Sequence, residues 1–256
     1  MLLAALLNGV VGFAFLHLKS ILKKEFRMKT KTKIIKEKPG AGRLGRHVEH
    51  DPQSRAFSAG TAAVKTVTYK RHGQPFDQGD LGSCTGNAMA GVLMTEPLWV
   101  PGRNLTEADA VNLYKAATKL DNIPGNYPPT DTGSSGLGVM KAAVNALYIV
   151  GYAHSFSLDQ LLGGLSLKPG ILGINWYNSF DSPKPDGECP LTAGAKVRGG
   201  HEVQMFGIDV KKKRVWCYQS WGATWGALKN GTFYFSWKTL GRLLSEQGDA
   251  TFPRTA

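Results

Sequence analysis

The stretch Asp77-Gln-Gly-Asp-Leu-Gly-Ser-Cys84-Thr-Gly-Asn-Ala places a cysteine directly before a run of small residues. The small and apolar residues from Thr85 to Trp99 predict a buried helix with Pro97 near its close. Cys84 then stands at a helix N-terminus, where unpaired backbone N–H groups and the helix dipole lower the pKa of a thiol. Six positions earlier, Gln78 carries an amide that can donate beside the Cys84 backbone N–H. Together these features predict a nucleophilic thiolate with an oxyanion hole for acyl transfer.

Two later segments supply partners for such a thiol. In Gly199-Gly-His201-Glu-Val-Gln-Met-Phe-Gly207, two glycines allow close backbone approach and His201 enters an apolar strand as the candidate general base. In Tyr218-Gln-Ser-Trp221-Gly-Ala-Thr-Trp225-Gly, the Gln219 side chain can accept from the imidazole and fix its tautomer, and the Trp221 indole can shield that bond from water. The predicted catalytic residues are therefore Cys84, His201, Gln78 and Gln219.

These three motifs, in this order and at these separations, resemble the papain family of cysteine peptidases. The resemblance covers roughly residues 44 to 250, and three further stretches are similar to its bacterial and phage branch: Leu44 to Phe57, Asp131 to Gly136 and Gly173 to Tyr177. It implies an α+β, papain-like, two-lobed fold with a helical half carrying Cys84 and a β-barrel-like half carrying His201. It also implies peptide-bond hydrolysis in the cleft between the two halves.

The sequence departs from the family pattern in several places. Thr85 follows the nucleophile where Trp is common, Leu81 replaces the family's paired cysteine so that the family disulfide is absent there, and Gln219 replaces the orienting Asn. The Gln219 amide sits one methylene farther from the backbone. No long helical propeptide is recognisable in residues 1 to 70, so the resemblance does not support autoinhibition by a family-type prosegment.

The pattern along the chain places helices first and strands later. Thr106 to Leu120 predicts an amphipathic helix with Thr106 as its N-cap, and Gly138 to Val150 predicts a third helix. Apolar, β-branched and aromatic runs then predict four strands: Gly170 to Trp176, Glu202 to Asp209, Arg214 to Gln219 and Thr232 to Trp237. This order predicts an α+β domain over residues 44–256, with two halves that meet along a cleft.

Most of the positive charge lies near the N-terminus. The chain has 31 Lys and Arg against 19 Asp and Glu, a formal net charge of +12, and eleven of the basic residues lie between Lys19 and Arg46. Residues 28–43 are predicted to form a basic, flexible arm. For the apolar and basic segment 1–27, three interpretations stay open: a marginal membrane anchor, an arm packed on a partner protein, or a stretch ahead of a true start at Met28.

The cysteine pattern and the charge limit the expected cofactors and partners. Cys84, Cys189 and Cys217 are too few for a disulfide scaffold, although a bond between the last two stays open. No Cys/His spacing suits a metal, so neither a metal nor another cofactor is expected. The expected partners are a protein or peptide substrate and other virion or envelope proteins, with membrane contact through residues 2–18 open and no specific nucleic acid. The expected location is cytoplasmic or virion-associated.

Three functions compete at this point. The leading hypothesis is a phage or bacterial cysteine endopeptidase that uses a Cys84 thiolate and His201 imidazolium with a Gln78 oxyanion hole. A peptidoglycan peptidase or amidase is the second, since cell-wall hydrolases also pair a helix-borne Cys with a strand-borne His. The third is a non-catalytic structural virion protein with a peptidase fold. The intact Gln78, Cys84 and His201 argue against this third function, and Gln219 alone favours it.

Overall fold

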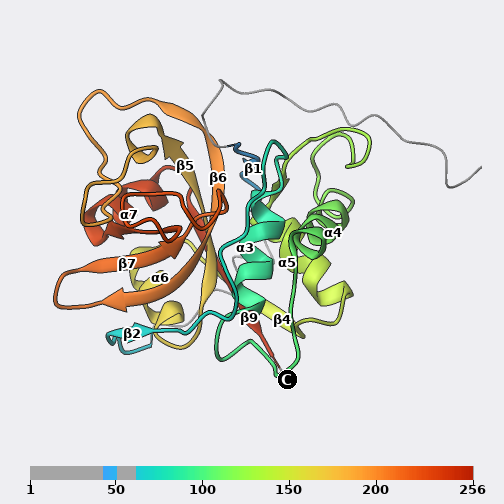
Figure 1. Ribbon diagram of the computed structural model, residues 1–256, viewed down its shortest axis with the longest axis horizontal. Coiled ribbons are helices and arrows are strands. Elements are labelled where there is room, and N and C mark those ends of the chain that lie inside the picture. Colours follow the sequence, from blue (N-terminus) through green and yellow to red (C-terminus); the bar gives the residue numbers. More distant parts are fainter. Residues whose placement is uncertain (1–42, 51–61, 256) are drawn as a thin grey trace, which may run out of the picture.

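The structure is a computed structural model that describes residues 43–50 and 62–255, and it combines helices with one large sheet (Figure 1). In chain order its elements are β1 (Arg46–His47), β2 (Val67–Thr68), α3 (Cys84–Leu93), α4 (Glu107–Ala117), β3 (Ser134–Ser135), α5 (Gly136–Asn145), β4 (Gly151–Ser155), α6 (Leu158–Leu165), β5 (Gly170–Tyr177), η1 (Asn178–Phe180), β6 (Val197–Asp209), β7 (Arg214–Tyr218), β8 (Thr232–Ser236), α7 (Trp237–Ser245) and β9 (Asp249–Arg254).

Helices α3, α4 and α5 pack around one hydrophobic cluster, and α3 is buried along its whole length. Gly86 brings α3 close to α4, because an added Cβ there would collide with the backbone oxygen of Ala110. Helix α4 begins with a capping box, in which Thr106 N donates to the Asp109 carboxylate (2.8 Å) and the Thr106 hydroxyl accepts from Asp109 N. The central position of α3 fixes the place of Cys84, its first residue.

The sheet runs in the order β4-β9-β5-β6-β7-β8, with every neighbouring pair antiparallel and β2 attached to β6. Helices α6 and α7 pack against it around the second hydrophobic cluster, and contribute leucines such as Leu161 and Leu243. The long strand β6 also contacts α3. His201 lies on β6, in register with Ile174 of β5.

The predicted helices and strands are present in the expected order with shifted ends, but α6 and α7 lie among the strands. The first helix ends at Leu93, short of the predicted Trp99, and there the Thr95 hydroxyl donates to the Gly91 carbonyl (2.9 Å). Strand β6 begins at Val197, ahead of the predicted Glu202, because its glycines pair with β5. The sequence analysis did not predict β4, α6, α7 or β9. The apolar segment 1–27 and nearly all of the basic arm lie outside the described residues. Among the residues described, no helix is long and apolar enough to cross a membrane.

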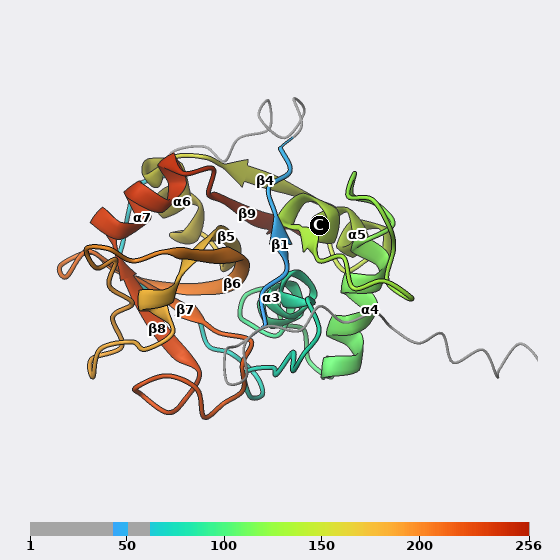
Figure 2. The same cartoon turned by 90° about the horizontal axis from the view of Figure 1, so that it is seen from above.

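Residues 43–50, which we call the strap, run between the helices and the sheet. Figure 2 shows β1, the strand within the strap, between α3 and α5 on one side and β6 on the other. Gly45 N donates to the Gly200 carbonyl of β6 (3.2 Å), and the Gly45 carbonyl accepts from Ser134 N of β3 (2.9 Å). Strand β1 pairs in parallel with β3. The strap is therefore hydrogen-bonded on both sides.

Candidate active site

Cys84 begins α3 as predicted, and its thiol is fully buried. The backbone of Glu202, the residue after His201, forms a hydrogen bond with the thiol, so α3 and β6 meet at this point. Burial raises the pKa of the Cys84 thiol to about 12, and this outweighs the lowering by backbone hydrogen bonds from Glu202 and Thr85. The expectation of a lowered pKa is therefore wrong for this conformation, because the helix terminus is shielded from water.

The imidazole of His201 lies against the side chain of Gln219. The distance between His201 Nε2 and Gln219 Oε1 is 2.5 Å, and the same oxygen accepts from the Ser220 backbone N–H at 2.9 Å. That second bond fixes the amide orientation, so His201 Nε2 must carry the proton and Nδ1 keeps a lone pair. Nδ1 has no hydrogen-bond partner among the described residues. The longer amide of Gln219 thus reaches the imidazole.

Aromatic rings enclose the imidazole. Trp221 stacks on His201 with 5.0 Å between ring centroids and 27° between the planes, and Trp176 approaches edge-on at 5.1 Å. His201 is fully buried. Burial lowers the pKa of His201 to about 3, although the hydrogen bond to Gln219 acts in the opposite direction. In this conformation the imidazole and the Cys84 thiol are therefore both neutral at pH 7.

Gln78 joins the loop before α3 to the loop after β7. Its amide nitrogen donates to the Leu81 carbonyl (2.8 Å), its amide oxygen accepts from the Ser220 hydroxyl (2.5 Å), and its backbone N–H donates to the Ser220 carbonyl (2.9 Å). The side chain thus spans the segments that carry Cys84 and Gln219. One of its two amide N–H bonds is used by Leu81, which leaves the other to donate.

The strap covers the place where these residues meet. An added Cβ on Gly45 would collide with the carbonyl of Gly82, two residues before Cys84, and one on Gly200, just before His201, would collide with the carbonyl of Arg46. The Trp221 indole N–H donates to the Arg43 carbonyl (3.1 Å). A short extended segment therefore packs over the site. The sequence analysis missed this cover, whose only signal was the pair of glycines before His201.

Arg43 anchors one end of the strap. Its Nη2 donates to Asp131 Oδ2 (3.0 Å), and the same carboxylate accepts from the Gly82 N–H (3.0 and 3.1 Å to its two oxygens) and from the Tyr114 hydroxyl (2.7 Å). Asp131 lies in the turn noted in the sequence, but its role was not predicted. It holds the strap and the loop before Cys84 in a fixed relation.

The two other cysteines are free and buried, in the cluster under the sheet. Burial raises the pKa of both Cys189 and Cys217 well above the ordinary thiol value. Because both thiols are free, the disulfide bond that the sequence left open is not formed.

Comparison with known proteins relates this chain to solved structures alone. Neither protein-family models nor curated protein sequences give a match. Xylellain, a cysteine protease from Xylella fastidiosa, superposes with a TM-score of 0.64 at 20% identity, over 88% of this chain and 100% of that one. Digestive procathepsin L 3 of Tenebrio molitor larval midgut gives 0.55 at 16% identity, over 91% and 79%. A cysteine protease from Carica candamarcensis gives 0.51 at 15%, over 74% and 99%. The chain therefore has a papain-like fold.

Proposed function

We propose that this protein is a papain-like cysteine peptidase that hydrolyses peptide bonds in protein or peptide substrates. The observation that carries the proposal is the contact of His201 Nε2 with Gln219 Oε1, which leaves His201 Nδ1 free to act as a base. The next residue, Glu202, forms a backbone hydrogen bond with the Cys84 thiol. The papain-like fold supports it. The helical part would form one lobe and the sheet the other, with the substrate between them.

The residues have complementary roles in this reaction. His201 Nδ1 takes the proton of the Cys84 thiol, and the sulfur attacks the substrate carbonyl carbon. The oxygen of the tetrahedral intermediate accepts hydrogen bonds from the Cys84 backbone N–H and the remaining N–H of the Gln78 amide. His201 then gives its proton to the leaving amine as the C–N bond breaks. Water attacks the resulting thioester while His201 Nδ1 takes its proton, and the C–S bond breaks to release the acid product and the Cys84 thiolate. Gln219 keeps the imidazole in the required tautomer.

The strap must leave this site before a substrate can bind. Its departure admits water to the thiol and the imidazole, and burial is the largest cause of both pKa shifts. The Cys84 pKa then falls, the His201 pKa rises, and the two groups can form the reactive ion pair. The described conformation corresponds to a resting state.

The origin and the setting of the protein rest on sequence alone. The motif Asp-Gln-Gly-x-Leu-Gly-Ser-Cys-Thr, residues 77–85, supports the bacterial or phage branch of the family. The basic residues before the strap support contact with other virion or envelope proteins.

A comparison of three full-length proteins tests the proposal. Fluorogenic peptides are incubated with the wild type, with Cys84→Ala and, as a matched control, with Cys217→Ala. We expect turnover in the wild type and in Cys217→Ala, and none in Cys84→Ala. A further variant that combines Arg43→Ala with Arg46→Ala makes weak turnover easier to detect, because both side-chain anchors of the strap are removed. Equal turnover by Cys84→Ala, or none even after strap release, would contradict the proposal.

A further inference from the structure

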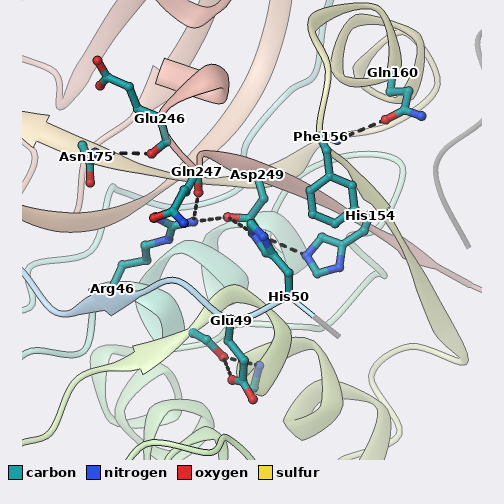
Figure 3. A network of polar contacts seen from close by, with 12 residues as sticks. Arg46, Glu49, His50, His154, Phe156, Gln160, Asn175, Glu246, Gln247 and Asp249 are labelled. Atoms are coloured by element: carbon teal, nitrogen blue, oxygen red, sulfur yellow. Dashed lines mark hydrogen bonds and ion pairs between the residues drawn. The ribbon is translucent and has the colours of Figure 1, made fainter. Parts of the chain in front are cut away.

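The Arg46 side chain of the strap is buried beside residues of β5, β6 and β9, at a site that we call the Arg46 pocket. The Arg46 side chain is 1% exposed, and its Nη2 contacts Asp249 Oδ1 and donates to the Gln247 carbonyl (3.0 Å). Figure 3 shows the guanidinium beside Gln247 and Asp249, with His154 on the far side of the carboxylate. His154 Nε2 lies 3.0 Å from Asp249 Oδ2, and His50 Nε2 lies 3.7 Å from Oδ1. The pocket thus presents an acidic group to a basic side chain.

A second carboxyl group lies in the same pocket. An added Cβ on Gly173 would lie 2.6 Å from Arg46 Nε, 2.8 Å from Asp249 Oδ1 and 2.9 Å from Glu202 Oε2, so all three groups converge there. A side chain at position 173 would therefore fill the space the guanidinium occupies. Gly136 gives room to Glu202 in the same way, because an added Cβ there would lie 3.2 Å from Oε1.

The pocket is not fully satisfied by its occupant. Glu202 is 1% exposed, and neither of its carboxyl oxygens has a hydrogen-bond partner among the described residues. Arg46 Nε and Nη1 are also buried without partners in that part of the chain. Buried polar groups in a purely structural contact are nearly always paired. Because these groups of Arg46 and Glu202 stay unpaired, we infer that the site can bind a guanidinium from another chain as well as that of Arg46.

The pocket adjoins the proposed catalytic residues. Glu202 follows His201 on β6, and its backbone contacts the Cys84 thiol. On the strap, Arg46 follows Gly45, the residue packed against the loop before Cys84. A substrate that lies along the same path would place a side chain near its cleaved bond in this pocket.

When the strap leaves, the Asp249 carboxylate loses the guanidinium of Arg46. Removing one partner of a buried ion pair leaves an uncompensated charge, which is strongly unfavourable. A cationic side chain from the substrate restores the balance, because a guanidinium can donate to both carboxyl groups at once. A neutral or acidic side chain cannot.

We infer that Asp249 and Glu202 form a specificity pocket for a basic substrate side chain, arginine above all, which Arg46 fills in the resting state. This inference rests on the proposed function and names its substrate class: peptides with an arginine close to the cleaved bond. Asp249 and Glu202 are specificity-determining residues that take no part in proton transfer.

The first test measures the substrate preference of the full-length wild type and of full-length Arg46→Ala. Peptide pairs carry arginine or its neutral isostere citrulline at each position in turn around a cleavable bond. We expect kcat/KM to be about 10- to 100-fold higher for arginine at one position, the range for a hydrogen bond to a charged group. Asp249→Asn should reduce this ratio without abolishing turnover, because Asp249 is the carboxylate that pairs with the guanidinium. Cleavage of both peptides at equal rates would overturn the inference and leave the proposed function intact.

The second test does not need catalysis. Butylguanidinium and the neutral butylurea are added to full-length Arg46→Ala and to the wild type, and thermal unfolding is followed. At about ten times its Kd, butylguanidinium should raise the Tm of Arg46→Ala by about 3 °C. Butylurea should not, and the wild type should respond to neither because its pocket is filled. Equal responses to both compounds would overturn the inference even if no peptide were cleaved. If Arg46→Ala does not fold, the wild-type peptide ratio decides the question.

Discussion

Arg43 and Arg46 lie three residues apart on the strap, and each binds a buried aspartate, but the two sites differ in how completely they are satisfied. Both oxygens of Asp131 have two donors, from Arg43, Gly82 and Tyr114. The site of Arg46 holds two carboxyl groups, one of which has no hydrogen-bond partner among the described residues. Asp131 also binds the backbone N–H of Gly82, so it holds the strap to the loop before Cys84. Asp249 contacts the strap through the side chains of Arg46 and His50.

This difference separates a structural contact from a recognition site. A saturated buried carboxylate stabilises one conformation and tolerates no loss of a partner. An under-satisfied pocket can exchange one guanidinium for another with little change in its own contacts. The strap is thus fixed at Arg43 by the fold and held at Arg46 by a site that a substrate can compete for.

Release of both ends should give the largest effect. In full-length protein with Arg43→Ala and Arg46→Ala, iodoacetamide should label Cys84 about 10³-fold faster at pH 7.5 than in the wild type, because its thiol pKa falls from about 12 toward the ordinary value near 8.5. Mass spectrometry of tryptic peptides gives the rates. Cys217 serves as the internal control and should not change. A rate for Cys84 equal to that of the wild type would show that the strap does not close the site.

Stability should separate the two carboxyl sites. Asp131→Ala should lower the free energy of unfolding by about 3 to 5 kcal/mol, since it leaves buried donors from Arg43, Gly82 and Tyr114 without an acceptor. At pH 4, Glu202→Gln should cost less than about 1 kcal/mol, because the protonated carboxyl group it replaces has no hydrogen bond to lose. Urea unfolding monitored by tryptophan fluorescence measures both. Equal decreases in the free energy of unfolding would show that the two carboxyl groups contribute alike to stability, against this account.

The pH dependence should identify Glu202 as a neutral group. Burial, followed by the negative charge of Asp249, raises the pKa of Glu202 well above its ordinary value of 4.5. The native state then holds a proton that the unfolded state has lost. The stabilisation is complete below pH 4.5 and declines by about 1.4 kcal/mol per pH unit above it, up to the raised pKa. Glu202→Gln carries no such proton, so its stability relative to the wild type should rise with pH in urea titrations at pH 4, 5 and 6. Parallel pH profiles would show that Glu202 is ionised.

Changes at Gln219 should be the smallest and should not involve the strap. Gln219→Ala should lower kcat by about tenfold, because the imidazole keeps its position between Trp221 and Trp176 but loses its tautomer partner. Gln219→Asn should lower it as well, since the shorter amide cannot span the 2.5 Å contact from the present backbone. Steady-state kinetics on the strap-released protein gives these ratios. Full activity in Gln219→Ala would remove Gln219 from the site.

The sequence was sufficient for residues whose chemistry is local and insufficient for those assembled from distant segments. Cys84 at a helix start and His201 on a strand follow from short motifs. The contact of Gln219 with His201 also follows from a motif, although whether its longer side chain reaches the imidazole depends on the backbone path of the folded chain. The Arg46 pocket joins residues about 200 positions apart, and no periodicity marks it. In the sequence, Arg46 was only one of the eleven basic residues counted near the N-terminus.

The same limit explains the wrong expectation for the Cys84 pKa. A helix N-terminus is visible in the sequence, and its effect on a thiol is predictable. Burial of the thiol comes from tertiary contacts, which no local motif shows, and it dominates the thiol pKa. The helices α6 and α7 were missed for a simpler reason, because their apolar stretches are short and broken by glycines.

Trapping of the acyl-enzyme tests most directly whether Cys84 is a nucleophile that acts on arginine-containing peptides. Full-length Arg46→Ala is mixed with a peptide ester whose arginine lies beside the ester bond, quenched with acid within milliseconds and digested for mass spectrometry. We predict an acyl group on Cys84, absent from the same experiment with Cys84→Ala and weaker with the citrulline ester. An adduct on Cys189 or Cys217, or none at any time point, would contradict the assignment of Cys84 as the nucleophile.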